Sequence, residues 1–253
     1  MTMNDRPDRE IKHGRKLSQS GAEHVWGWGT PAGRMRAERR AHWIASAADL
    51  RPRKRVLEIG CGTGLFTQFF ASSGAEILAL DISEDLLRLA RQRNLPKTVR
   101  FICSPFEELS ANEPFDAVIG SSILHHLDIQ LALKHIYRLL KPGSTMCFTE
   151  PNMLNPQILL QKNIPFLKAR LGDSPDETAF FRRRLQGWMK DNHFVNIHIT
   201  PFDWLHPATP SRLVPLVNTI GGYIEKLPIL QEFAGSLFIY GQRPRVGAKE
   251  PKG

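Results

Sequence analysis

From residue 55 onwards, apolar positions form short runs that alternate with segments of helical spacing. Arg55 to Ile59 is an apolar, partly β-branched run, which is typical of a buried strand. Leu65 to Ala71 has apolar residues at 65, 66, 69 and 70, which is helical spacing. The same reading predicts strands at 76–80, 99–103, 115–120 and 145–149, and helices after Ser83 and Asp128, which are residue types that cap helices. This alternation predicts an α/β fold, with a parallel sheet and helices on both faces.

The remaining parts of the chain are less regular. Residues 1–20 are polar and are expected to be poorly ordered, and a helix is predicted at 33–50. A helix near 178–191 and strands at 194–200 and 236–240 complete a mostly parallel sheet of seven strands. We therefore expect an N-terminal arm and lid helix (1–50), a main domain (51–243) with lid insertions near 153–178 and 203–232, and a polar tail (244–253).

Composition narrows the class of protein. The chain has 253 residues, of which 42% are hydrophobic, enough for one well-packed core. No apolar run reaches the roughly 18 residues that would span a bilayer, and the polar N-terminus has no secretory apolar segment. Cys61, Cys103 and Cys147 show no metal-ligand spacing. We expect free thiols in a cytoplasmic protein with no metal site.

A glycine loop follows the first predicted strand. It reads Gly60-Cys61-Gly62-Thr63-Gly64, with Glu58 two residues before it. A dinucleotide loop has its third glycine one residue later, where this chain has Leu65. An acid suits an ammonium group better than a pyrophosphate, and Asp81 ends the next strand, where an acid can accept hydrogen bonds from ribose hydroxyls. These features favour an adenosine ligand without phosphates and disfavour a nicotinamide oxidoreductase.

From about Val56 to Asn152, the chain resembles the class I S-adenosylmethionine-dependent methyltransferases. The resemblance implies a Rossmann-like fold and S-adenosyl-L-methionine as cofactor, with S-adenosyl-L-homocysteine as product. It also implies a set of cofactor-binding residues: Glu58, Gly60, Cys61, Gly62, Gly64, Asp81, Ile82, Pro105, Phe106, Gly120 and Ser121. Pro105 stands where the family often has an acid that accepts from the adenine amino group. The backbone N–H of Phe106 and apolar packing are then expected to hold the adenine.

Methyl transfer is an in-line displacement that needs an aligned acceptor and, for an oxygen acceptor, often a base. His125 and His126 follow the fourth predicted strand and Glu150 ends the fifth, so these three are the candidate catalytic residues. The alternatives are that the histidines pack or cap a helix and that Glu150 makes a structural hydrogen bond. Trp26, Trp28, Arg34 and Arg36 either fold over the cofactor or pack on the outer helices.

The acceptor is less constrained. Residues 153–171 and 204–232 are rich in Leu, Ile, Pro and Phe, with basic residues between them (Lys162, Lys168, Arg170, Arg212 and Lys226). They predict an apolar pocket for a small, hydrophobic or lipid-like acceptor methylated at oxygen, with a peripheral membrane surface and a lid packed on its own domain as open alternatives.

A net charge of +9 is compatible with binding to nucleic acid, anionic lipid or an acidic small molecule. It is equally compatible with basic residues that only cover solvated helix faces. An RNA or protein methyltransferase and a non-catalytic, S-adenosylmethionine-binding regulatory module are the rival functions. The stretch Gly120-Ser121-Ser122-Ile123 lacks the Asn/Asp-Pro-Pro-Tyr/Phe segment of enzymes that methylate base amino groups, which disfavours nucleic acid. The oligomeric state stays open.

Overall fold

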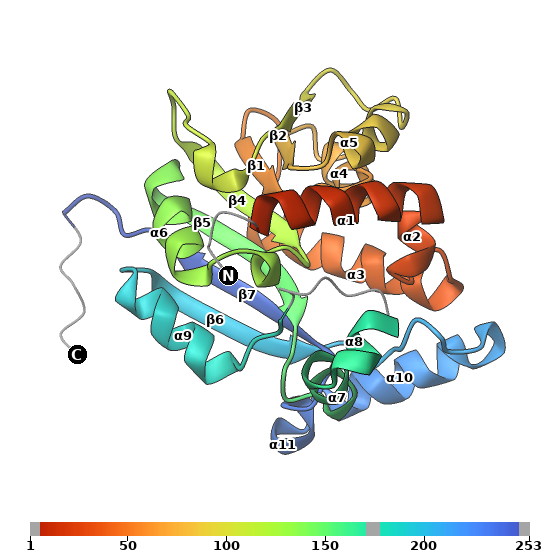
Figure 1. Cartoon of the computed structure of the whole chain (residues 1–253). Helices are drawn as coiled ribbons and strands as arrows, with labels where there is room; N and C mark the ends of the chain where they lie inside the picture. The colour runs from red at the N-terminus through yellow and green to blue at the C-terminus, as the bar shows by residue number, and fades with distance from the viewer. Residues whose placement is uncertain (1–5, 171–177, 248–253) are drawn as a thin grey trace.

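The structure, a computed structural model, describes residues 6–170 and 178–247 (Figure 1). Seven strands form one sheet in the order β3-β2-β1-β4-β5-β7-β6. The strands are β1 (Arg55–Ile59), β2 (Glu76–Asp81), β3 (Val99–Cys103), β4 (Phe115–Ser121), β5 (Leu140–Pro151), β6 (Val195–Phe202) and β7 (Ser236–Gln242). Neighbouring strands from β3 to β5 are parallel, and β7 runs antiparallel to β5 and to β6. The predicted seven-stranded, mostly parallel, Rossmann-like sheet is confirmed.

Helices and 3-10 turns connect and flank the strands. The first half of the chain has α1 (Arg6–Ser20), α2 (Ala22–Val25), α3 (Pro31–Ala47), α4 (Leu65–Ala71), α5 (Glu84–Arg91), η2 (Phe106–Glu108), η3 (Leu124–His126) and α6 (Ile129–Leu139). The second half has α7 (Pro156–Asn163), α8 (Pro165–Arg170), α9 (Arg182–Asp191), η4 (Ser211–Leu213), α10 (Val214–Ile224) and α11 (Pro228–Gln231). No described helix is long and apolar enough to cross a membrane.

The sheet has a buried apolar layer on each face. Residues of α3, α4 and α5 pack on one face, for example Ile44 and Phe70 against Val56. Residues of α6 and α9 pack on the other, where Ile136 and Met189 belong to the same cluster as Leu57. Side chains of a strand point alternately to the two faces, so β1 contributes to both cores.

The helix starts that the sequence predicted are confirmed. The Ser83 side chain accepts a hydrogen bond from the backbone N–H of Leu86, at the start of α5. The Asp128 carboxylate accepts from the N–H groups of Gln130 and Leu131, at the start of α6. These caps satisfy donors that lack a partner in the first turn of a helix. They also fix the residues at which the loops leading from β2 to α5 and from η3 to α6 end.

Some predicted boundaries are wrong. Residues 6–20 are not poorly ordered but form helix α1, which packs on α5 and buries Leu17. Strand β5 is longer than the predicted 145–149, because pairing with β4 already begins at Leu140, before a register shift. Helix α9 begins at Arg182 rather than near 178, since Phe180 bridges to Asn152 instead. Residues 1–5, 171–177 and 248–253, which include parts of the predicted arm, insertion and polar tail, lie outside the described residues.

Candidate functional site

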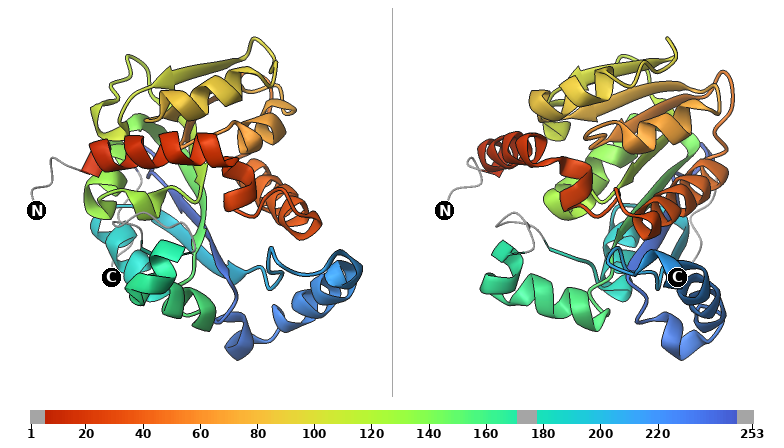
Figure 2. Two further views of the ribbon diagram at one scale, coloured as in Figure 1. Left: turned by 45° about the vertical axis from the view of Figure 1, so that its right-hand side comes forward. Right: turned by 90° about the vertical axis from the view of Figure 1, so that its right-hand side faces the viewer.

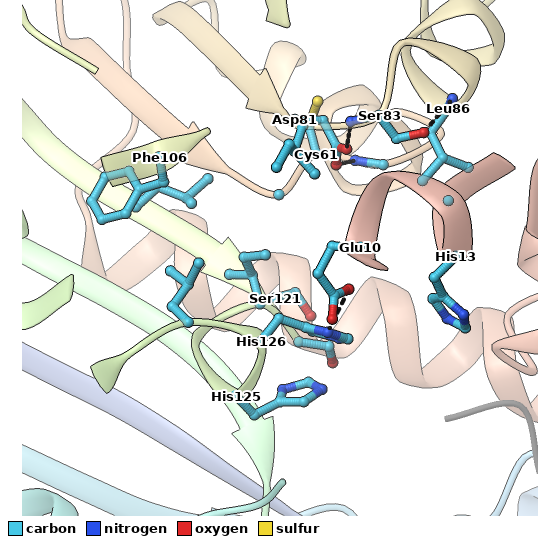
Figure 3. Close-up of a pocket in the computed structure, with 18 of the residues that line it drawn as sticks. Glu10, His13, Cys61, Asp81, Ser83, Leu86, Phe106, Ser121, His125 and His126 are labelled. Carbon is cyan, nitrogen blue, oxygen red and sulfur yellow. Dashed lines mark hydrogen bonds and ion pairs between the residues drawn. The ribbon is translucent and has the colours of Figure 1, made fainter. Parts of the chain in front are cut away.

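A cavity of about 750 Å³ lies at the carboxyl ends of the parallel strands. The turn after β1, the ends of β2 and β4, and the segments that follow β3 and β4 form its walls, and residues of α1 and α7 also line it. In an open α/β sheet, ligands bind at this edge, where loops from neighbouring strands diverge. Figure 3 shows that the lining side chains come from segments far apart in the sequence.

The glycine loop follows β1 closely. Gly60, Gly62 and Gly64 all have positive φ (+67°, +52° and +75°), a conformation that favours glycine. A Cβ atom at Gly60 would lie 2.5 Å from the Ile123 side chain, and one at Gly62 would lie 3.2 Å from the Trp26 ring. Gly60, Cys61 and Gly62 line the cavity, so the loop presents its backbone there.

Three of the predicted cofactor-binding residues lie behind this wall instead. Gly64 packs against Ala90 of α5, Gly120 packs against the carbonyl oxygen of Ile59, and Glu58 is buried; none of them lines the cavity. Burial raises the pKa of the Glu58 carboxyl to about 8, with the nearby Asp81 adding to the rise. Glu58 is therefore largely protonated at neutral pH and supports the loop from below.

Asp81 is held rigidly at the end of β2. Its two carboxylate oxygens accept hydrogen bonds from the backbone N–H groups of Gly62 and Ser83, each at 2.8 Å. Burial raises the pKa of Asp81, and these two hydrogen bonds oppose that rise. Asp81 and Ile82 both line the cavity, and a carboxylate oxygen keeps acceptor capacity after one hydrogen bond. The site thus offers a fixed acceptor to hydroxyl groups of a ligand (Figure 3).

The segment after β3 closes one side of the cavity. Pro105 and Phe106 line it, and Phe106 is buried with its ring edge-on to His135, at 4.8 Å between ring centroids. Glu107 and Glu108, which the sequence reasoning did not weigh, also line the cavity. The part of the cavity nearest Phe106 therefore has an apolar base, with the carboxylates of Glu107 and Glu108 close by.

His125 and Glu150 form a buried pair beside the cavity. Nδ1 of His125 lies 2.5 Å from Oε2 of Glu150, and Oε1 of Glu150 accepts from the backbone N–H groups of Ile123 and Leu124 at 2.9 and 2.8 Å. His125 lines the cavity, whereas Glu150 is fully buried and does not. The catalytic role predicted for Glu150 stays a prediction. Its carboxylate contacts the turn that carries His125 and does not reach the cavity, so it can act on a ligand only through His125.

His126 contacts the N-terminal helix instead. Its Nδ1 lies 3.2 Å from Oε2 of Glu10, so α1 and η3 meet at the edge of the cavity (Figure 3). His13 and Gly14 also line the cavity, and a Cβ atom at Gly14 would lie 2.5 Å from the Ser83 hydroxyl. Helix α1 therefore covers the cavity between α5 and η3. An arm and lid helix were predicted within residues 1–50, but residues 1–20 were expected to be poorly ordered, because this stretch is mostly polar and its contacts come from distant segments.

A buried arginine that the sequence reasoning missed lies in the wall near β4. Arg40 of α3 is 3% exposed; it donates to Ser122 Oγ at 3.2 Å and to Ser236 Oγ, and its guanidinium lies over the Trp28 ring. Burial lowers the pKa of Arg40 to about 10, with the charge of Arg36 adding to that effect and Asp203 opposing it. Arg40 thus stays protonated at neutral pH and places a positive charge in the cavity wall.

The other N-terminal candidates divide between the cavity and the surface. Trp26, Trp28 and Arg36 line the cavity, and Arg36 donates to Asp203 at 2.7 Å, while Arg34 is exposed and does not line it. Ser121 lines the cavity and accepts a hydrogen bond from Thr149 at 2.9 Å. Among the described residues, no three His, Cys, Asp or Glu side chains come together as metal ligands.

Comparison with known families matches the part of the chain that builds most of this cavity. Residues 56–143 match the family described as "Methyltransferase domain". This range runs from β1 to the turn within β5. It includes the glycine loop, Asp81 and both histidines.

Comparison with individual proteins extends the likeness. The chain is 35% identical over 118 residues to the ubiquinone biosynthesis O-methyltransferase of Xanthomonas campestris, an alignment that covers 45% of this chain and 49% of that protein. The chain thus spans about half the length of this curated relative.

Solved structures show the fold over a longer range. A chain from the complex of the Trm112 methyltransferase activator with a methyltransferase of Haloferax volcanii has a TM-score of 0.68 and 16% identity, covering 92% of this chain and 98% of its own. Phosphoethanolamine N-methyltransferase 2 of Haemonchus contortus, solved with phosphomonomethylethanolamine and S-adenosylhomocysteine, has a TM-score of 0.66 and 17% identity, covering 90% of this chain and 58% of its own.

Proposed function

We propose that this chain is a class I S-adenosylmethionine-dependent methyltransferase that transfers a methyl group from S-adenosylmethionine to an oxygen atom of a small, hydrophobic acceptor. The observation that carries the proposal is the His125–Glu150 pair, which lies next to the glycine loop and Asp81 in one cavity. The pair supplies a base, and the loop and Asp81 supply a site for a nucleoside. A site with both parts suits proton removal from an acceptor held beside a bound methyl donor.

The cavity residues fit S-adenosylmethionine at each end of the molecule. Asp81 offers acceptor capacity to the two ribose hydroxyls, and Pro105 and Phe106 offer an apolar surface to the adenine. The backbone of Gly60 and Gly62 lines the cavity, so the methionine part can approach main-chain atoms there. Cys61 also lines this wall; burial raises the pKa of its thiol well above the ordinary value, which keeps the thiol neutral beside a cationic ligand.

Arg40 is the residue that we assign to the carboxylate of the methionine part. It is the buried cation of the cavity wall, and Ser121 and Ser122 at the end of β4 lie next to it. A guanidinium presents planar donors that match a carboxylate. Arg34 is exposed and does not line the cavity. Arg36 and Arg40 share the Asp203 carboxylate, at 2.7 and 3.5 Å, and of these two we choose Arg40, because it also reaches Ser122 at the end of β4.

His125 acts as the base in this proposal. Glu150 accepts the Nδ1 proton, so Nε2 of the neutral imidazole carries the lone pair that can take a proton. The two backbone N–H groups that bind Glu150 keep its carboxylate in place as the imidazole gains charge. S-adenosylmethionine supplies a methyl group already activated on a sulfonium, so proton removal and alignment are the tasks left to the protein.

An acceptor with apolar character suits the remaining part of the cavity. Leu127 and Leu131 line it from the α6 side and Ile158 lines it from α7, so this part offers apolar side chains beside the polar Gln161 and Lys162. The ubiquinone biosynthesis O-methyltransferase that resembles this chain supports an oxygen acceptor on a lipid-like molecule. We therefore propose a small phenol or related hydroxyl compound with an apolar substituent.

Calorimetry and a methyl-transfer assay test this function together. The full chain is titrated with S-adenosylmethionine, S-adenosylhomocysteine and NAD, and then incubated with radiolabelled S-adenosylmethionine and alkyl-substituted phenols. We expect binding of the first two ligands, transfer to oxygen, and a loss of about 10²–10⁴-fold in turnover for His125→Asn with cofactor binding retained.

The rival functions predict other results. Binding of NAD alone would refute the cofactor assignment. Tight binding of S-adenosylmethionine without turnover on any phenol would favour a non-catalytic module, and turnover on RNA or protein instead would refute the acceptor class. Full activity of His125→Asn would remove His125 as the base.

A further inference from the structure

The second half of the chain carries most of the exposed apolar side chains. Of the eighteen large hydrophobic residues that are exposed in the described chain, four lie between residues 159 and 166 and eight between 213 and 233. Phe166 is 67% exposed and Ile229 is 79% exposed. Single exposed apolar residues are ordinary, but a concentration of this kind marks an interaction site. We call these twelve residues, with the helices α7, α8, α10 and α11 that carry most of them, the apolar end of the molecule.

Helix α10 shows that this exposure is organised. Leu216, Ile220 and Tyr223 follow one another at spacings of four and three, which places them along one side of the helix, and all three are exposed. Leu213 and Leu227, just beyond the two ends of the helix, are exposed as well. Val214 and Gly221 on another side are buried, and Gly221 packs closely against Trp204. One side of α10 therefore packs against the rest of the protein, and a second, apolar side faces outward.

The helices of the apolar end lie at the same end of the molecule. In Figures 1 and 2, α7, α8, α10 and α11 occupy the lower part of every view. Asn155, which caps α7, donates to the carbonyl oxygen of Phe233 at 2.9 Å, and Gln157 lies 2.7 Å from the His206 ring, so the two segments are tied together. They present their outward sides from one connected structure.

Basic side chains occur among the apolar residues of this end. Lys162, Arg212 and Lys226 belong to it. Two carboxylates occur within residues 153–167 and 204–233, and each is engaged by an arginine elsewhere: Glu225 with Arg39, and Glu232 with Arg182. Basic residues among exposed apolar ones are typical of surfaces that insert shallowly into anionic bilayers.

A second copy of the chain suits this surface less well. In a two-fold dimer, the same patch meets itself, so Arg212 and Lys226 would face a surface on which, among the described residues, both carboxylates are already engaged by arginines. An anionic bilayer supplies both an apolar layer and the opposite charge.

The cavity lies next to the apolar end. Ile158, Gln161 and Lys162 of α7 line the cavity, while Leu159 and Leu160 of the same helix are exposed. Residues one or two positions apart on a helix point to different sides, so α7 separates the cavity from the outward surface. A molecule dissolved in a bilayer beneath the apolar end would have a short route to the site.

We propose that the apolar end docks on an anionic membrane surface and takes up a bilayer-dissolved acceptor beside α7. The docking itself does not depend on the reaction. The uptake rests on the proposed function and deepens it, because it places the acceptor in the membrane.

Flotation of the full chain with vesicles tests the docking. Vesicles of phosphatidylcholine alone are compared with vesicles containing phosphatidylglycerol at one third of the lipid. Two variants address the two forces: Ile220→Glu/Ile229→Glu for apolar insertion and Arg212→Glu/Lys226→Glu for charge. Their matched controls are Val246→Glu, an 88% exposed apolar residue outside the apolar end, and Arg183→Glu, an exposed arginine of α9.

We expect binding to the anionic vesicles, a fall of about tenfold or more in the partition coefficient for either double variant, and little change for the controls. Circular dichroism and cofactor affinity of the double variants show that the fold is kept. Absence of vesicle binding, or an equal loss in the controls, would overturn the proposal. So would a dimer in light scattering that the Ile220→Glu/Ile229→Glu change converts to a monomer while vesicle binding is absent.

Uptake is tested separately, by turnover on an alkyl phenol placed in vesicles and on a short, water-soluble phenol. We expect the double variants to lose activity on the first and keep activity on the second. If the double variants are equally active on both substrates, uptake from the bilayer is refuted. If the wild type is inactive on both substrates, the proposed function is refuted, and the vesicle-binding result is unaffected.

Discussion

Nδ1 of His125 and Oε2 of Glu150 are 2.5 Å apart, although 25 residues separate them in the chain. One residue follows β4 and the other ends β5, and these strands are neighbours in the sheet. Replacing Glu150 with Gln keeps a carbonyl oxygen for the N–H groups of Ile123 and Leu124 but turns an amide NH₂ group toward His125. The ring nitrogen Nδ1 must then accept, which leaves the proton on Nε2.

We therefore expect Glu150→Gln to lower turnover by about 10²–10⁴-fold, as loss of a general base does. Binding of S-adenosylmethionine, measured by calorimetry, should change by less than about twofold. Glu113→Gln, an exposed carboxylate outside the cavity, is the control. Wild-type turnover in Glu150→Gln would show that the pair is structural.

Helix α1 provides a second prediction, through its close approach to Ser83. Gly14→Val adds a side chain where a Cβ atom alone would lie 2.5 Å from the Ser83 hydroxyl, so α1 must move away from α5. We expect cofactor affinity to fall by about tenfold, while the unfolding midpoint of the sheet domain changes little. Calorimetry and thermal unfolding measure the two effects.

Gly187→Val is the control for the Gly14 change, because nothing lies within 4 Å of a Cβ atom there. An unchanged cofactor affinity in Gly14→Val would show that α1 does not close over the ligand.

Arg40 gives a prediction about the methionine end of the cofactor. Arg40→Lys keeps the charge but loses the planar donors, and Arg40→Met removes the charge as well. We expect the affinity for S-adenosylmethionine to fall by about tenfold in the first and about a hundredfold in the second, since a buried charged hydrogen bond contributes about 1.5–3 kcal/mol.

Decarboxylated S-adenosylmethionine separates this role of Arg40 from general damage to the site. Its affinity should be nearly the same in the wild type and both variants, because it lacks the group that Arg40 binds. An equal loss of affinity for both ligands would contradict the assignment.

The pKa of Glu58 leads to a prediction on stability. Burial raises it from 4.5 to about 8, so the folded chain keeps this proton over a range in which the unfolded chain loses it. The contribution of Glu58 to the free energy of unfolding is fully present below pH 4.5 and is lost as the pH rises to about 8. The Glu58→Gln side chain cannot ionise. The unfolding free energy of this variant, relative to that of the wild type, should therefore rise between these two pH values by an amount on the order of 3–5 kcal/mol.

Urea unfolding of both proteins at several pH values between 4.5 and 9 measures this difference. Glu76→Gln, an exposed carboxyl on β2, should follow the wild type at every pH. A constant difference between Glu58→Gln and the wild type across the range would show that Glu58 is ionised in the folded state.

Much of the fold follows from local patterns in the sequence. The strands β1, β2 and β3 match their predicted ranges within one residue, because each is a short, mainly apolar run. Ser83 and Asp128 mark helix starts, because a cap acts within three residues. The glycine loop was also predictable, since its conformation depends on positive φ at Gly60 and Gly62.

The assignment of roles within the site was not predictable in the same way. The sequence placed Glu150, His125 and His126 at the ends of adjacent strands but could not tell which side chain faces the cavity. In the structure, Glu150 is buried and accepts hydrogen bonds from the backbone, and Glu10 of α1 contacts His126. Arg40 was missed because it lies in an ordinary-looking basic helix and becomes distinctive only when Ser122, Ser236 and Trp28 surround it.

The sequence by itself determined the strand and helix order, the glycine loop and the acid at Asp81, because each depends on neighbours within a few residues. Only the tertiary structure decided that α1 covers the cavity, that Glu150 supports His125, and that the apolar residues of 159–166 and 213–233 face outward at one end. These relationships join segments more than twenty residues apart. Their geometry depends on how the strands are ordered and the helices packed, and local spacing does not encode it.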